Sequence, residues 1–91
     1  MEKVRIRILI EGRVQGMNFR YHTQQQATKL GLVGFVRHLS DGRIEIQVQG
    51  EEDKVDQMLD WCQAEPHGKH IKSILFRHDE PVERYTDFTV R

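Results

Sequence analysis

The sequence lacks the features of a secreted or membrane-bound chain. It holds one cysteine, Cys62, in 91 residues, so no disulfide forms within the chain. No apolar run approaches membrane-spanning length, and the opening Met-Glu-Lys-Val-Arg does not resemble a secretory signal. We therefore expect a cytoplasmic protein in a reducing setting, without a membrane partner.

Net charge is also absent from the sequence. The 14 Lys and Arg residues balance 14 Asp and Glu residues, so no overall field attracts nucleic acid or anionic membrane. Any recognition of an anion must therefore be local. The 91 residues suffice for one hydrophobic core and leave no room for a second. We expect a single domain over residues 1–91 that stands as a monomer.

Apolar residues alternate with polar ones in two stretches, Lys3 to Glu11 and Arg43 to Gln49. This period of two is typical of strands with one buried face. Ser40-Asp41-Gly42 has the residue types of a hairpin turn, and the segment 32–39 supplies the strand before it. The pattern therefore predicts a β-hairpin in the middle of the chain.

Two segments have the spacing of helices. The first runs from about Arg20 to Leu30 and ends at Gly31, a common helix stop. The second follows Glu51-Glu52-Asp53, whose negative charges suit a helix N-terminus. Its apolar residues recur at i, i+3, i+4 and i+7, in the order Val55, Met58, Leu59 and Cys62. We interpret Met58 and Cys62 as core residues, and Cys62 as an inert thiol.

Two further strands are predicted near the end of the sequence, at Ile71 to Arg77 and Tyr85 to Val90. The resulting order is β-α-β-β-α-β, with one possible extra strand. This order predicts an α+β fold of the ferredoxin-like split β-α-β kind. We expect an antiparallel sheet of four to five strands, covered on one face by two helices.

The stretch Gly12-Arg-Val-Gln-Gly16-Met-Asn-Phe-Arg20 separates the first strand from the first helix. Its two glycines let the backbone curl so that successive N–H groups point at one acceptor. The helix start adds a positive dipole, and Arg20 adds a planar fork of donors. These features favour a phosphate site. The spacing alone leaves a second interpretation open, a tight turn with a solvated arginine.

The residues in several segments resemble the acylphosphatase family. Gly12 to Arg20 matches its Gly-x-Val-Gln-Gly-Val-x-Phe-Arg signature, with Met17 in place of the usual valine. Leu30-Gly-Leu-Val-Gly-Phe-Val36 is similar to the second block of the family, with Phe35 where tryptophan or tyrosine often stands. Asp41-Gly42 and the segment 44–50 match the hairpin and the third strand. The resemblance spans nearly the whole chain.

The resemblance implies hydrolysis of the carboxyl–phosphate bond of acyl phosphates, without metal, cofactor or covalent intermediate. The expected partners are a small-molecule acyl phosphate and inorganic phosphate. An acyl phosphate already has a good leaving group, so positioning and charge stabilisation supply most of the catalysis. In the family, loop amides and the motif arginine hold the phosphoryl group. These roles fall on Gln15, Gly16, Met17, Asn18, Phe19 and Arg20.

His38 stands where the family has the asparagine that positions the attacking water. Neutral histidine also offers one acceptor and one donor, but on opposite edges of a larger ring. We therefore expect Arg20 and His38 to be the catalytic residues of an acylphosphatase whose activity His38 reduces. The alternative is a weak or inactive homologue that binds phosphate or acyl phosphate without turning it over.

Three other features of the sequence bear on function. His67 and His70 flank a Pro/Gly break without a nearby cysteine, so we interpret them as surface residues and expect no metal site. Trp61 falls beside the apolar stripe of its helix, which indicates a partly buried packing residue. The element order is shared with RNA-recognition modules, but the first and third strands have no aromatic residue on which bases stack. We therefore predict no nucleic-acid partner.

Overall fold

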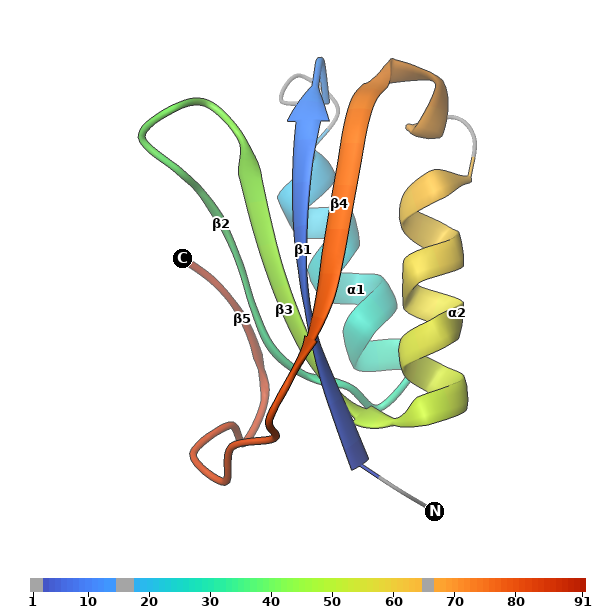
Figure 1. Ribbon diagram of the computed structural model, residues 1–91, viewed down its shortest axis with the longest axis vertical. Helices are drawn as coiled ribbons and strands as arrows, with labels where there is room; N and C mark the ends of the chain where they lie inside the picture. The colour runs from blue at the N-terminus through green and yellow to red at the C-terminus, as the bar shows by residue number, and fades with distance from the viewer. Residues whose placement is uncertain (1–2, 15–17, 65–66) are drawn as a thin grey trace.

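The computed structural model describes residues 3–14, 18–64 and 67–91, which form two helices and a five-stranded sheet (Figure 1). The elements follow the predicted order. They are β1 (Lys3–Gly12), α1 (Phe19–Lys29), β2 (Val33–His38), β3 (Ile44–Glu51), α2 (Glu52–Gln63), the 3-10 turn η2 (Gly68–His70), β4 (Ile71–Asp79) and β5 (Phe88–Val90). The ferredoxin-like split β-α-β arrangement is confirmed.

The sheet has the strand order β4-β1-β3-β2-β5. All neighbours pair antiparallel except β2 and β5, which run parallel. The sheet is therefore mixed, and the expectation of a wholly antiparallel sheet needs this correction. The chain leaves β4 at one edge and reaches the opposite edge, so no hairpin turn fixes the direction of β5. Val82 in the connection exchanges two hydrogen bonds of 2.7 Å with the side chain of Gln49 on β3.

Both helices pack on the same face of the sheet, where the core lies (Figure 1). The alternating residues of β1 and β3 supply the sheet side of the core. Phe19 and Ala27 from α1 and Val55, Met58 and Cys62 from α2 supply the helix side. The core roles predicted for Met58 and Cys62 are confirmed. Burial raises the pKa of the Cys62 thiol to about 12, so the thiol stays protonated and inert.

The helix-free face of the sheet is polar but not fully open to water. Glu45 on β3 has a side chain that is only 2% exposed. It accepts hydrogen bonds of 2.5 Å from Arg7 on β1 and from Arg37 on β2. Burial opposes ionisation of Glu45, but the two arginines outweigh it and hold the pKa of the carboxyl below its ordinary value. This triplet ties three strands together.

The strands β2 and β3 approach closely at Gly34. Its φ is +134°, and a Cβ built there would lie 1.9 Å from the carbonyl oxygen of Gln47. Only glycine fits this position, which places the start of β2 close beside β3. Neither helix of the described residues has the length and apolar character that crossing a membrane requires.

Candidate functional site

A hollow of about 290 Å³ opens where the start of α1 meets the ends of β2 and β5. Elements that are far apart in sequence therefore contribute to one site. The lining side chains are Asn18, Phe19, Arg20, Tyr21, His38, Ile44 and Val90. Four of the expected site residues, Asn18, Phe19, Arg20 and His38, are thus brought together. Gln15, Gly16 and Met17 lie outside the described residues.

The first turn of α1 presents main-chain donors to the hollow. Asn18, the N-cap, adopts a left-handed conformation with φ 54° and ψ 38°, and within the described chain its side chain makes no capping hydrogen bond. The first helical bond runs from His22 N to Asn18 O at 3.0 Å. The N–H groups of residues 19–21 precede it, so they have no partner within the helix. A left-handed residue followed by a helical one turns such groups toward a common point.

The two described residues at the start of the loop, Arg13 and Val14, are both held in place. Val14 is 1% exposed and belongs to the core. The main-chain N–H of Arg13 donates to the carbonyl oxygen of His70 at 2.9 Å. The valine of the signature therefore has a structural role here.

Arg20 projects from the first turn of α1 toward β5. One of its terminal nitrogens, Nη1, donates to the main-chain oxygen of Arg91 at 3.3 Å. Gln24, one turn further on, donates to the main-chain oxygen of Phe88 at 3.1 Å. These contacts fix β5 against α1. A guanidinium has five N–H donors, and within the described residues Arg20 uses one of them here, which leaves others for an anion in the hollow.

His38 ends β2 on the sheet face that carries the helices, opposite Ile44 of β3. Partial burial, and then the positive charge of Arg20, lower the pKa of its imidazole below the ordinary value of 6.5. At neutral pH most of the rings are therefore uncharged. A neutral imidazole has one nitrogen that accepts a hydrogen bond and one that donates, which is the capacity that an amide would provide.

The ring of Phe19 packs against two other aromatic rings. Its ring centroid lies 5.8 Å from that of Trp61, in a stacked arrangement, and 5.4 Å from that of His67. His67 is 8% exposed, and its Nε2 contacts the carbonyl oxygen of Trp61. The prediction that His67 lies on the surface was wrong, because its ring packs against those of Phe19 and Trp61. Trp61 packs partly buried against the core, as predicted.

Glu45 was missed as a residue that shapes the site. Its alternation with apolar neighbours predicts only an outward-facing position. In the structure Arg37, which it binds, is adjacent to His38, and Glu45 itself is adjacent to Ile44. The triplet with Arg7 therefore holds the ends of both strands that line the hollow. The two arginines lie on the strands on either side of β3. A pattern within β3 alone therefore does not reveal that they bind Glu45.

The other histidines do not join a metal site. His22 and His70 are exposed. Across residues 3–14, 18–64 and 67–91, no three His, Cys, Asp or Glu side chains are grouped so that they could hold a metal ion.

The fold and the hollow together define a class, the two-layer α/β sandwiches that present a cationic site at the start of a helix. The family model for acylphosphatase matches residues 6–90. The chain therefore belongs to the acylphosphatase family.

Relatives and solved structures agree with this assignment. An acylphosphatase of Synechococcus sp. is 41% identical over 90 residues, which are 99% of this chain and 95% of the relative. An acylphosphatase of Trichormus variabilis is 41% identical over 78 residues, or 86% of this chain and 77% of the relative. The solved acylphosphatase of Coxiella burnetii has a TM-score of 0.86 at 31% identity, covering 98% of this chain and 93% of that chain.

Proposed function

We propose that this protein hydrolyses acyl phosphates to a carboxylate and inorganic phosphate. Arg20 and residues 15–19 would hold the phosphoryl group, and His38 would position the attacking water. One observation carries the proposal: Arg20, His38 and the first turn of α1 line the same hollow, although they come from separate elements.

The binding role follows from the donors around the hollow. The N–H groups at the start of α1 and the guanidinium of Arg20 suit the oxygens of a phosphoryl group, and the helix dipole adds positive potential. Arg20 stabilises the negative charge that the phosphoryl oxygens carry as the transition state forms. Water attacks phosphorus, the bond from phosphorus to the acyl oxygen breaks, and the electron pair leaves with the carboxylate.

The role of His38 depends on its charge. The neutral ring of the free protein accepts a hydrogen bond from water and can take up its proton as the new bond forms. Once protonated, the ring has no acceptor left, although it still attracts phosphate. This second behaviour supports the other candidate function, a module that binds phosphate or acyl phosphate without turnover. His38 at the position of the family asparagine is the observation that favours it.

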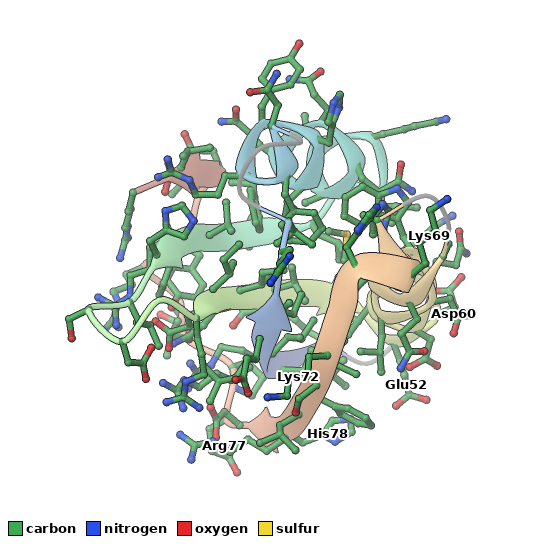
Figure 2. All side chains as sticks on the ribbon, turned by 90° about the horizontal axis from the view of Figure 1, so that it is seen from above. Glu52, Asp60, Lys69, Lys72, Arg77 and His78 are labelled. Carbon is green, nitrogen blue, oxygen red and sulfur yellow. The ribbon has the colours of Figure 1, made fainter. Side chains whose placement is uncertain are left out.

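Phosphate release from benzoyl phosphate, measured on the wild type, Arg20→Ala and His38→Asn, tests the proposal. We expect hydrolysis by the wild type, a loss of roughly a hundredfold or more in Arg20→Ala, and faster turnover in His38→Asn. Arg77→Ala is the matched control, because this arginine is exposed on β4, far from α1 (Figure 2). It should behave as the wild type.

Phosphorus NMR titration with inorganic phosphate separates the two functions. If the wild type binds phosphate through Arg20 but releases none from benzoyl phosphate, the protein is a binding module and the enzyme proposal is wrong. If the wild type is already as fast as His38→Asn, the histidine does not limit turnover and our account of position 38 is wrong.

We further infer that the protein acts as one domain over residues 1–91, as a cytoplasmic monomer without a nucleic-acid partner. The continuous core shared by both helices and the sheet supports the single domain. The absence of net charge supports the lack of a nucleic-acid partner.

A further inference from the structure

Part of the hollow is apolar and faces solvent. The side chains of Tyr21 and Val90 are 56% and 41% exposed, and both line it. Ile44, which is buried, forms an apolar part of its floor. Exposed apolar side chains that gather around a hollow beside polar groups are a common property of ligand sites. We call Tyr21, Ile44 and Val90 the apolar rim.

Main-chain contacts hold Val90 of the apolar rim in place. Val90 lies beside Val36 in the parallel pairing of β5 with β2, and the N–H of Arg91 donates to the oxygen of Val36 at 2.8 Å. Tyr21 belongs to the first turn of α1, and its ring meets that of His22 edge-on at 5.4 Å. A ligand that contacts Val90 and Ile44 therefore meets a wall that the sheet forms in advance, which lowers the entropic cost of binding.

Charge divides the hollow into two parts. Among its described lining residues, Arg20 and His38 are the groups that carry or acquire positive charge, and none is acidic. If the phosphoryl group lies between Arg20 and His38, the rest of the described lining offers no cation to a second anionic group. The volume of about 290 Å³ is at the small end of the range for ligand sites, so the group beside the phosphate must be compact.

We propose that the apolar rim binds the acyl half of the substrate. It selects compact, uncharged, apolar acyl groups, including aromatic ones, over acyl groups that carry a carboxylate. This inference rests on the proposed function, because it assigns the substrate class of the same site. Tyr21 and Val90 are then specificity residues.

Two pairs of substrates test the selection. Benzoyl phosphate against acetyl phosphate measures the gain from apolar surface, and butyryl phosphate against succinyl phosphate measures the cost of a carboxylate at equal chain length. We expect kcat/KM of the wild type to favour butyryl over succinyl phosphate by about tenfold or more. Equal values for this pair would overturn the selection against charge.

Two acyl phosphates also differ in their intrinsic reactivity. This difference cancels when the ratio of their kcat/KM values is compared between a rim variant and the wild type. Tyr21→Gln keeps a good helix former, and Val90→Thr keeps the shape and the strand preference. Each should lower the benzoyl-to-acetyl ratio of kcat/KM by roughly three- to tenfold. Leu75→Thr is the control, since Leu75 is 60% exposed on β4 and outside the hollow. An unchanged ratio in both rim variants would overturn the proposal.

Binding of phosphonates tests the rim without turnover. We expect phenylphosphonate to bind the wild type more tightly than methylphosphonate by about fivefold, and Tyr21→Gln to abolish most of this preference. If no substrate is hydrolysed but this preference is observed, the proposed function fails and the rim stands. If substrates are hydrolysed without preference and both phosphonates bind equally, the rim fails and the proposed function stands.

Discussion

The two helices of this protein begin in opposite electrostatic states. The helix α2 follows Glu51 in an extended conformation and carries Glu52 and Asp53 in its first turn. The helix α1 follows a left-handed Asn18, has no acidic residue in its first turn, and carries Arg20 there. In Figure 2 the side chain of Glu52 points from α2 toward solvent.

The difference separates a helix start that is already compensated by acidic residues from one that is suited to an anion. Acidic residues in the first turn of α2 compensate its positive dipole and need no ligand. The start of α1 keeps its dipole uncompensated and adds a cation to it, which costs stability until an anion binds. The sequence thus distinguishes α1 from α2 in two ways: the first turn of α1 contains Arg20, and it contains no acidic residue.

The largest predicted effect concerns pH. The lowered pKa of His38 keeps the neutral ring populated below pH 6.5, where a free histidine is already charged. Because kcat/KM reports the free protein, it should fall on the acid side with a midpoint below 6.5, approaching tenfold per pH unit. The folded state favours the neutral ring, so the stability contributed by this group is present above pH 6.5 and is lost as pH falls from 6.5 through the lower pKa of the folded state. The profile of His38→Asn should lack this limb, and identical profiles would contradict the role of His38.

A smaller effect follows from giving α1 an acid. His22→Asp places a negative charge in its first turn, which should stabilise the protein by about 0.5 kcal/mol. The same charge repels the substrate, so we expect kcat/KM to fall about threefold. The control His22→Asn removes the ring without adding charge. If the two variants have the same free energy of unfolding and the same kcat/KM, the start of α1 does not have the uncompensated positive dipole that we infer.

The smallest effect on activity is expected at α2. Neutralising its start with Glu52→Gln and Asp53→Asn together should lower the free energy of unfolding by about 0.5–1 kcal/mol. Because α2 contributes no side chain to the hollow, kcat/KM should stay within error of the wild type. Asp60→Asn is the matched control, since an acid near the end of the helix opposes the dipole there and its removal should not destabilise. A loss of activity on neutralising the start would show that the two helix starts are coupled.

Much of this architecture could be predicted from the sequence because its signals are local. Alternation identified β1 and β3, the i, i+3, i+4, i+7 spacing identified α2, and the loop signature located the start of α1. The direction of β5 was not predictable, since it depends on where residues 80–87 cross the sheet. Only three residues of the predicted strand 85–90 pair, in Phe88–Val90.

Within the candidate site, Arg20 and His38 could be named in advance because the family motif places them. The burial of His67 against Trp61 and Phe19 could not, because a histidine beside a Pro/Gly break carries no sign of which surface covers it. The apolar rim was equally hidden. Tyr21, Ile44 and Val90 come from three elements, and only the assembled sheet places Ile44 and Val90 beside α1.

The hydrogen bond between Arg20 and Arg91 joins residues that are 71 positions apart. During synthesis, α1, β2 and β3 leave the ribosome well before β5 does. A nascent chain can therefore form its central hairpin early. The side of the hollow that Val90 lines and the hydrogen bond that restrains Arg20 form last. Such long-range closure is slow compared with local folding. An anion at this site acts late, stabilising the finished fold by mass action and giving no help to the stages before it.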